Sequence, residues 1–426
     1  MVQLYEELRA FRDLGRIIKV GLVGAGFMGR GIVEVVESIP GMKVVAIADR
    51  EVERACGCFD HIQFNRYRVI EKTDEARDID FSSERVVTRN PRVIPEIGAL
   101  AFIIEATGDP VAGAEVAFFS IMNGKHVGML NVETDSVVGY YLSGLAKKMG
   151  VVYTVCAGDE PVAVKELYDF ARTCGFTVVA AGKGKNNPLD VRATPDTLRE
   201  RASSMGLHPA RLTEFVDGTK TMVEMCCVAN SSMLTIDVRN MHGPHAGVEE
   251  LTSVFRLREQ GGILTREGVV DYTIGDVAPG VFAVVRHEGK IANETLRYLK
   301  IGDGPNYLLY RPYHLTSLEV PRTIALACLY GRPMLSASSL QTEVITIAKK
   351  DLRAGDYIDG FGGFCVYGGL ERYEKAKNEK LLPMGLATGA RLKEDIPEGS
   401  AIRFDQVEVV DSLLLQLRKI QDRLNG

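Results

Sequence analysis

The sequence predicts an α/β protein with three parts: an N-terminal Rossmann dinucleotide-binding domain, an α+β catalytic domain and a small β-rich C-terminal module. Three observations support this. A glycine-rich turn lies between an apolar run and a helical pattern near the N-terminus. Further buried-strand runs alternate with helical patterns up to about residue 155. Short extended pieces separated by glycine turns then occupy residues 339–426.

The composition is that of a globular enzyme. The chain has 426 residues, 46% of them hydrophobic, which is enough apolar material for two or three cores. Its 51 basic and 56 acidic residues give a formal charge of −5 and are mixed along the chain without a long basic run. This pattern argues against nucleic acid or an anionic membrane surface as a partner. We expect a small-molecule substrate instead.

The sequence shows no sign of export or membrane insertion. No stretch approaches the roughly 20 apolar residues of a transmembrane helix, and residues 1–15 lack the pattern of a signal peptide. The eight cysteines form no CxxC pair, which favours reduced thiols. We therefore expect a cytoplasmic protein, without a membrane partner, that assembles as a homo-oligomer.

The first domain is predicted to span residues 1–155. Apolar residues at helical spacing predict an amphipathic helix at 4–14 that packs on the segment after it. The strands are expected at 17–23, 44–48, 100–108, 126–130 and 151–155, and the main helices at 27–40 and 137–149. Residues 51–97 are polar and rich in Arg, Asp and Glu. We expect this segment to cap the sheet edge or the cofactor cleft.

Two further parts complete the chain. Residues 156–338 show longer polar turns between strands and one strong helical pattern at 218–230, which predicts an α+β catalytic domain. Residues 339–426 have the pattern of a separate β-rich module, with extended pieces near 344–347, 360–364 and 382–386 and a closing amphipathic helix at 412–424.

The cofactor site is predicted at the first strand–helix turn. In the pattern Gly24-x-Gly26-x-x-Gly29, the glycines allow a tight turn, close approach of a pyrophosphate and close packing of helix on strand. Phe27 and Met28 would open the helix, whose N-terminal N–H groups bind phosphate. An ordinary glycine turn is the alternative, but the flanking strand and helix favour a cofactor.

Two more pairs of residues complete this expected site. Asp49, at the end of the second strand, can bind the ribose hydroxyls of NAD, and Arg50 can hold the 2′-phosphate of NADP, so the choice of cofactor stays open. Thr107 and Gly108 end a central strand where this fold approaches the nicotinamide ribose. A simple strand-to-loop glycine would look the same.

The most unusual segment runs from Asp217 to Glu224. Asp217 is a plausible N-cap, which places Lys220 in the first helical turn, where the helix dipole opposes an ammonium group. A lysine kept there can have a lowered, catalytic pKa. With Glu224 one turn later, we assign Lys220, Glu224 and Asp217 to acid/base chemistry. A surface ion pair is the alternative.

Two clusters have the composition of anion sites. Lys183 and Lys185 lie in a glycine-rich loop after a strand, where open α/β folds bind ligands, although a solvated turn would look similar. Arg311 and His314 flank a rigid Pro-Tyr pair and can point at one anion. We assign all four residues to the substrate.

Two weaker candidates remain. The glycine and proline in Met241-His242-Gly243-Pro244-His245 exclude a helical zinc pair, so one of these histidines, His242 in our assignment, is expected as an acid/base or substrate contact. Asp159 and Glu160 follow a strand end beside the predicted cleft. They can bind a divalent ion or cap the next helix, and capping is the commoner role.

Taken together, these motifs resemble the 1-deoxy-D-xylulose 5-phosphate reductoisomerase-like (DRL) oxidoreductases, a family related to homoserine dehydrogenase. The resemblance is carried by residues 24–29, 104–108, 182–184, 217–224, 241–244 and 310–315. Residues 339–426 are similar to SAF-type β-modules.

The resemblance implies an NADPH-dependent rearrangement and reduction that forms 2-C-methyl-D-erythritol 4-phosphate, a step of isoprenoid biosynthesis, with Mg²⁺ or Mn²⁺. Lys220 with Glu224 and Asp217 would then be the acid/base group. The phosphate would be held by Lys183, Lys185, Arg311 and His314, and the metal would face Asp159 or Glu160.

The leading hypothesis is an NAD(P)-dependent isomeroreductase or dehydrogenase acting on a small phosphorylated polyol. A dehydrogenase for a hydroxy-amino acid such as homoserine is the alternative enzyme. A non-catalytic nucleotide-binding sensor is the alternative outside enzymes.

Overall fold

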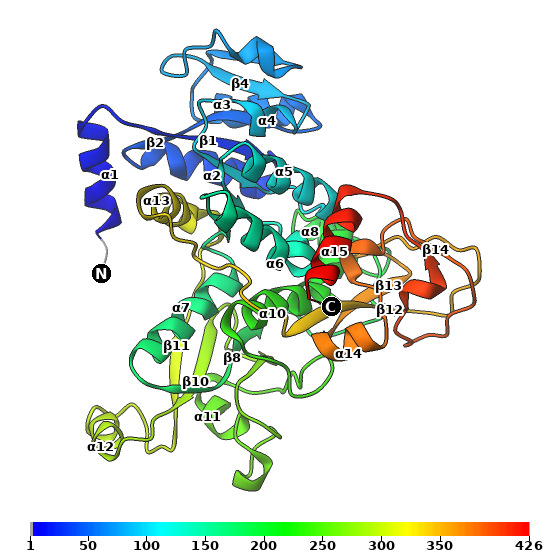
Figure 1. Cartoon of the computed structure of the whole chain (residues 1–426). Coiled ribbons are helices and arrows are strands. Elements are labelled where there is room, and N and C mark those ends of the chain that lie inside the picture. Colours follow the sequence, from blue (N-terminus) through cyan, green and yellow to red (C-terminus); the bar gives the residue numbers. More distant parts are fainter. Residues whose placement is uncertain (1–2, 426) are drawn as a thin grey trace. The chain divides into compact units, whose positions relative to one another are not determined.

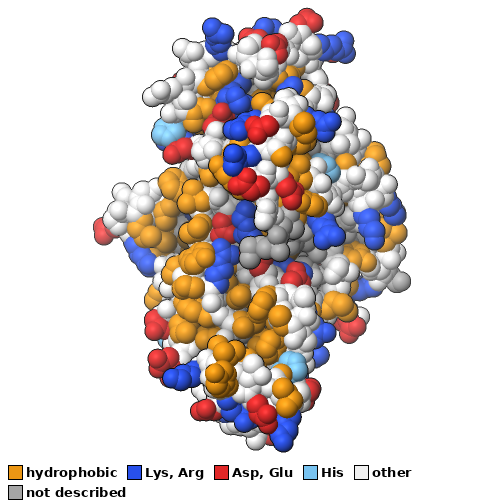
Figure 2. Space-filling view, turned by 90° about the vertical axis from the view of Figure 1, so that its left-hand side faces the viewer, with side chains coloured by type: hydrophobic (Ala, Val, Ile, Leu, Met, Phe, Trp, Pro, Cys, Tyr) orange, Lys and Arg blue, Asp and Glu red, His pale blue; other side chains and the backbone are white. Residues whose placement is uncertain are grey.

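The computed structural model describes residues 3–425 and divides into two compact units (Figure 1). The first comprises Met1–Asp159, Leu315–Ser336 and Gln416–Gly426, and the second comprises Glu160–His314 and Ala337–Leu415. Within residues 3–425, no helix combines the length and the apolar character that a membrane crossing requires. The face drawn in Figure 2 carries acidic and basic side chains interspersed, which agrees with the mixed charge of the sequence.

The first unit is built on a seven-stranded parallel sheet in the order β3-β4-β2-β1-β5-β6-β7. Its strands are β1 (Ile18–Val23), β2 (Met42–Ala48), β3 (Tyr67–Ile70), β4 (Arg85–Thr88), β5 (Phe102–Glu105), β6 (His126–Met129) and β7 (Tyr153–Val155). The helices are α1 (Leu4–Asp13), α2 (Phe27–Ser38), α3 (Val52–His61), α4 (Val93–Glu96), α5 (Pro110–Met122), α6 (Val132–Lys148) and α13 (Val320–Tyr330), together with most of α15 (Leu413–Leu424). This is the Rossmann-type architecture that the sequence predicts.

Helices cover both faces of this sheet. One core cluster contains buried side chains of α1, α2, α3 and α13, and a second contains those of α4 and α5. Coverage on both faces explains why the central strands are apolar almost without interruption rather than alternating, since both faces of a parallel sheet are buried. The strand order reverses at β1, which lies between β2 and β5, and open α/β folds bind ligands at such a switch point.

The prediction for residues 51–97 needs correction. This segment does not simply cap the sheet; it contains α3 and adds β3 and β4 to the sheet edge. The apolar signal is short because β3 and β4 have four residues each, and only the Val-Val pair of β4 stands out in the sequence. The helix expected at 137–149 likewise begins earlier, at Val132, because its first turn carries polar residues that obscure the apolar period.

The second unit is built on a four-stranded sheet in the order β11-β10-β8-β9. Its strands are β8 (Thr177–Lys185), β9 (Val269–Ile274), β10 (Val281–Arg286) and β11 (Asn306–Arg311), with β12 (Thr342–Ala348) and β13 (Val366–Arg372) in one antiparallel pair and β14 (Arg391–Leu392) and β15 (Val407–Glu408) in another. The helices are α7 (Glu160–Thr173), α8 (Arg199–Ser204), α9 (Pro209–Val216), α10 (Thr219–Ser232), α11 (Leu251–Val254), α12 (Lys290–Tyr298) and α14 (Tyr373–Asn378).

The two faces of the four-stranded sheet differ. Phe282 and Val284 of β10 join an apolar cluster that includes α11. Because side chains alternate along a strand, Lys183 of β8, which pairs with Val281 of β10, lies on the other face. Helices α7 and α10 pack there. The charged residues discussed below therefore share one face of the sheet, beneath two helices.

The C-terminal strands differ from the expected separate module. Residues 337–415 lie in the same unit as residues 160–314, because β12 and β13 pack against α10. Asn230 of α10 donates to the Thr342 carbonyl (3.2 Å), and the Gly368 N–H donates to Thr219 Oγ1 (2.9 Å). Residues 315–336, expected in the catalytic domain, lie in the first unit instead. The SAF-type assignment stays a prediction.

The ends of segment 160–314 meet. In the first unit the Thr316 N–H donates to the Gly158 carbonyl (2.8 Å). In the second unit His314 Nε2 lies 3.6 Å from Glu160 Oε2. The two ends of segment 160–314 therefore lie close to each other.

Candidate functional site

The glycine turn lies at the switch point of the parallel sheet. Gly24 follows β1 with φ of 101°, a conformation that favours glycine, and a Cβ there would lie 2.7 Å from the Ala106 carbonyl oxygen at the end of β5. A Cβ on Gly29 would lie 2.1 Å from the Gly24 oxygen, so this glycine allows α2 to pack closely. A Cβ on Gly26 would meet nothing within 4 Å. The open side of the turn is therefore at Gly26, where a pyrophosphate would approach.

The start of α2 suits a dinucleotide. Gly26 is the N-cap and brings no side chain to the first-turn N–H groups of Phe27 and Met28, which are the groups that bind phosphate at a helix N-terminus. Asp49 Oδ2 accepts from the Ala25 N–H (2.7 Å) and Asp49 Oδ1 from the Glu51 N–H (2.9 Å). Asp49 thus holds the turn as well as lying where a ribose would bind, and Arg50 beside it is exposed.

Gly26→Ala should separate cofactor binding from stability. Gly26 has φ of −70°, which alanine adopts readily, so we expect the free energy of unfolding to change by less than about 0.5 kcal/mol. The added methyl would occupy the open side of the turn, and we expect the Kd for NADH or NADPH to rise at least about tenfold. Nucleotide fluorescence titration measures the Kd and urea denaturation the stability.

Gly29→Ala is the matched comparison for this test. Its methyl would meet backbone, so we expect a loss of stability that Gly26→Ala does not show. Unchanged nucleotide affinity in Gly26→Ala would contradict a cofactor at this turn.

Thr107 and Gly108 lie next to the glycine turn, because β5 pairs with β1 and Val23 is in register with Glu105. The Thr107 N–H donates to Glu105 Oε1 (2.9 Å), while Glu105 Oε2 is buried and has no hydrogen-bond partner among the described residues. Burial raises the pKa of Glu105 to about 7, although hydrogen bonding from Thr107 opposes this rise. A buried carboxyl group with a raised pKa therefore lies beneath the predicted nicotinamide region.

Glu105→Gln should change how stability depends on pH. The pKa of Glu105 is about 7 in the folded chain, against an ordinary value of 4.5. Between pH 4.5 and about 7, the folded state therefore binds a proton at Glu105 that the unfolded state has lost. Its contribution to the free energy of unfolding is fully present below pH 4.5 and is lost as the pH rises through about 7. The difference corresponds to about 3 kcal/mol. We expect Glu105→Gln to be the more stable protein at pH 8 but not at pH 5.

Urea denaturation of both proteins at the two pH values measures this effect. Glu115→Gln, on the neighbouring α5 and paired with Arg92 at the surface, is the control and should follow the wild type. Parallel pH profiles for wild type and Glu105→Gln would contradict the expectation.

The second unit gathers three charged groups on the face beneath α7 and α10. Lys183 Nζ of β8 lies 2.6 Å from Glu160 Oε1, at the start of α7, and also contacts Glu224 Oε2 of α10. The three side chains are 8%, 9% and 3% exposed. An ammonium group has three N–H donors, and two are taken by these carboxylates. The third has no protein partner among the described residues.

The surroundings shift the protonation of this group. Burial disfavours the charge on Lys183, but Glu160 and Glu224 outweigh it and hold the pKa of Lys183 well above its usual value. Burial and the charge of Glu160 raise the pKa of Glu224 to about 7, against the opposing effects of Lys183 and Lys220. The group therefore combines a permanently charged lysine with a carboxyl group able to exchange a proton near neutral pH.

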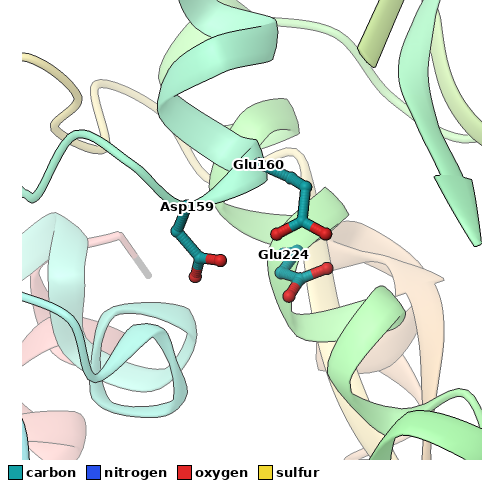
Figure 3. A group of neighbouring side chains, drawn as sticks. All are labelled: Asp159, Glu160 and Glu224. Atoms are coloured by element: carbon teal, nitrogen blue, oxygen red, sulfur yellow. The ribbon is translucent and has the colours of Figure 1, made fainter. Parts of the chain in front are cut away.

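Asp159 directly precedes Glu160, and the three acidic residues Asp159, Glu160 and Glu224 each offer an oxygen within 4.8 Å of the others (Figure 3). Carboxylates in this number suit Mg²⁺ or Mn²⁺. Two of the three, however, already contact the Lys183 ammonium group. The three carboxylates therefore have the number and spacing that a divalent ion needs, but the Lys183 ammonium group already occupies two of them.

Lys220 lies in the first turn of α10, as predicted, one turn before Glu224. The N-cap differs from the prediction. It is Gly218, with φ of 87°, and Asp217 ends α9. Asp217 nevertheless caps the helix, because its Oδ1 accepts from the Thr219 N–H (2.9 Å). Its other oxygen lies 2.8 Å from Lys349 Nζ in an ion pair that is almost completely buried.

The remaining residues assigned to the substrate phosphate have protein partners. Lys185 donates to the carbonyls of Asn187 and Phe215 (both 2.7 Å) and more weakly to Pro188 (3.4 Å). Burial, with the charge of Lys183, lowers the pKa of Lys185 to about 8. Arg311 pairs with Glu166 of α7 at 2.9 Å. Lys183 is joined to the carboxylates, so the four predicted phosphate ligands do not form one free cationic pocket.

His314 is oriented by the backbone. Its Nδ1 lies 2.8 Å from the Pro279 carbonyl oxygen, an acceptor, so Nδ1 carries the proton and Nε2 faces Glu160. His314 therefore joins the Lys183 group.

His242 has a different set of partners. Among the described residues they are Asp237, whose Oδ2 lies 2.8 Å from His242 Nε2, and Asp271, which accepts from the His242 N–H (3.1 Å). His242 follows two consecutive non-glycine residues with positive φ, Asn240 and Met241, a strained conformation that is frequent near functional sites.

Comparison with known proteins agrees with this organisation. Residues 158–320, which contain the Lys183 group, match the family model of the oxidoreductase DRL catalytic domain. This segment is therefore similar to the DRL catalytic domain. The resemblance predicted from the sequence is thereby confirmed for this part of the chain. The chain combines a Rossmann-type sheet with a segment that matches an oxidoreductase family model. A search among curated proteins finds no match.

Solved structures that match this chain include two dehydrogenases and one reductoisomerase. Homoserine dehydrogenase from Thiobacillus denitrificans is 14% identical, with 93% of this chain and 99% of that chain covered and a TM-score of 0.44. A probable dehydrogenase from Thermotoga maritima is 13% identical, with 74% and 90% covered and a TM-score of 0.43. 1-Deoxy-D-xylulose 5-phosphate reductoisomerase from Zymomonas mobilis, in complex with NADPH, is 16% identical, with 50% of this chain and 58% of that chain covered and a TM-score of 0.37. This chain thus spans little more than half of that reductoisomerase.

The sequence alone did not reveal how residues 158–320 bring their charged side chains together. Lys183, Glu160 and Glu224 were each singled out, but for three separate roles, because 23 and 41 residues separate the lysine from its partners. The partners Glu166, Asp237 and Lys349 were missed. Asp237 had a weak signal, since it is an acidic residue five positions before His242, whereas nothing local distinguishes Glu166 or Lys349.

Proposed function

We propose that the protein is an NAD(P)H-dependent isomeroreductase or dehydrogenase that acts on a small phosphorylated polyol, with the chemistry at Lys183, Glu160 and Glu224. The observation that carries the proposal is the third N–H of Lys183. A buried ammonium group with two N–H groups bonded to carboxylates keeps one N–H for a substrate oxygen.

The proposed roles follow from charge and protonation. The bound nicotinamide supplies or accepts a hydride. Lys183 stabilises the negative charge that develops on the substrate oxygen, because its fixed ammonium group lies in a low-dielectric surrounding. Glu224, with a pKa near 7, accepts the proton of a substrate hydroxyl or returns it. Glu160 orients Lys183 through their ion pair, and His314 lies beside the other side-chain oxygen of Glu160.

The phosphate in this proposal depends on the family resemblance. Lys185 and Arg311 have protein partners, so binding a phosphate would require each to exchange one of them. This favours an alternative in which the substrate has no phosphate, as in a homoserine-type dehydrogenase. There Lys220, in the first turn of α10, would be the proton donor.

Substrate assays separate these possibilities. Oxidation of NADPH or NADH is followed at 340 nm with 1-deoxy-D-xylulose 5-phosphate or with aspartate semialdehyde, each with and without Mn²⁺. Turnover of the first supports the isomeroreductase, and turnover of the second supports the alternative. A sensor would bind nucleotide and turn over neither. Absence of turnover with the first substrate and both nucleotides contradicts the specific form of the proposal.

Lys220→Ala tests whether this lysine belongs to the reaction. If the protein is an enzyme that uses Lys220, the variant loses turnover by orders of magnitude but still binds nucleotide. If the protein is a sensor, the variant binds nucleotide like the wild type and there is no turnover to lose. Lys290→Ala, on the exposed helix α12, is the control for removing a lysine charge.

A further inference from the structure

The acidic residues beside Lys183 would suit a divalent cation if the lysine were absent. Mg²⁺ and Mn²⁺ prefer carboxylate oxygens, and Mg²⁺ binds them at about 2.1 Å. An ion bridging Glu160 and Glu224 would occupy the space between these carboxylates. That space is where the Lys183 ammonium group lies, 2.6 Å from Glu160 Oε1 and in contact with Glu224 Oε2.

The ammonium group and a divalent ion cannot share this space. Two positive charges this close repel each other strongly where little water screens them, and the repulsion doubles when one of them is a divalent ion. Lys183 also has little freedom to withdraw. It projects from β8, an inner strand of its sheet between β9 and β10, and its side chain is 8% exposed.

We infer that Lys183 is a built-in cation that excludes a divalent metal from the group formed by Asp159, Glu160 and Glu224. The lysine supplies at this position the positive charge that a metal would otherwise supply. The inference concerns metal binding alone and holds for any substrate. Its failure is therefore distinguishable from failure of the proposed function.

Removing the lysine charge should create a metal site. In Lys183→Met the carboxylates keep their positions on α7 and α10 but lose the ammonium group. We expect this variant to bind one Mn²⁺ at least about 100-fold more tightly than the wild type, because affinity for hard cations rises with the net negative charge of the ligands. Lys183→Arg keeps the charge and should bind no more Mn²⁺ than the wild type.

The experiment uses the EDTA-treated full chain without substrate or nucleotide. Mn²⁺ is titrated and free Mn²⁺ is measured by electron paramagnetic resonance. Lys185→Met is the matched control, since Lys185 lies two residues along the same strand but bonds to carbonyls rather than to carboxylates. It should behave as the wild type. The double variant Lys183→Met/Glu224→Gln should lose the site that Lys183→Met gains.

Two outcomes overturn the inference. One is micromolar Mn²⁺ binding by the wild type that Glu224→Gln abolishes, which would mean that the lysine moves aside for the metal. The other is a folded Lys183→Met variant that gains no site. If Lys183→Met does not fold, Lys183→Gln takes its place, because its amide can still donate to a carboxylate. A gain of Mn²⁺ binding in Lys183→Gln then supports the inference, and no gain overturns it.

Discussion

Glu224→Gln is expected to lower kcat by about 10²- to 10⁴-fold, the usual contribution of a positioned general acid or base. Glutamine keeps the shape of the side chain and can still contact Lys183, but it cannot exchange a proton. The Kd for nucleotide should stay unchanged, because the glycine turn belongs to the other unit. Initial rates on the substrate identified by the assays above, with a nucleotide titration in parallel, measure both quantities.

The pH profile of this variant distinguishes proton transfer from a structural role. The pKa of Glu224 is raised to about 7 by burial and by the charge of Glu160. The wild-type profile should therefore contain an inflection near pH 7 that Glu224→Gln lacks. Glu374→Gln, at an exposed position of α14, should retain both rate and profile. A rate within tenfold of the wild type with an unchanged inflection would remove Glu224 from the chemistry.

Lys349→Met is expected to lower the free energy of unfolding by about 3 to 5 kcal/mol, the usual cost of breaking one side of a buried ion pair. Lys349 lies 2.8 Å from Asp217 Oδ2, and the two side chains are 2% and 0% exposed. Its ammonium group also donates to the Ala193 (2.7 Å) and Gly363 (2.9 Å) carbonyls. Methionine fills a similar volume but leaves the Asp217 carboxylate buried without its counter-charge.

The double variant Asp217→Asn/Lys349→Met separates charge from packing. It removes both charges, so we expect it to recover part of the lost stability. The carbonyls of Ala193 and Gly363 still lack their donor, which limits this recovery. Urea denaturation followed by circular dichroism measures all three proteins, and Lys350→Met, at the exposed neighbouring residue, is the control. A loss below about 1 kcal/mol in Lys349→Met would contradict the expected role of the pair.

The parts of the structure that follow from local pattern were predictable. The glycine turn, Asp49 and the end of β5 come together because parallel strands align their carboxyl ends, and the sequence marks each strand by an apolar run. The helix containing Lys220 and Glu224 was expected at 218–230 and lies at Thr219–Ser232. In both places the neighbouring residues carry the information.

The parts that depend on distant pairing were not predictable. The sequence indicates that Lys183 and Lys185 are two similar cations in one loop, yet one binds carboxylates and the other backbone carbonyls. This difference arises from α7, α10 and the end of α9, which pack beside β8 only in the folded chain. The position of residues 337–415 depends in the same way on Asn230, Thr219 and Lys349, whose partners are more than a hundred residues away.

The adjacency of Gly158 to Thr316 and of Glu160 to His314 has an evolutionary consequence. A segment whose two ends lie side by side can be inserted into a host fold, or replaced by another, without moving the host strands apart. Residues 160–314 have this property, and they carry Lys183, Glu160 and Glu224. This segment can therefore diverge or be exchanged while the parallel sheet of the first unit stays the same.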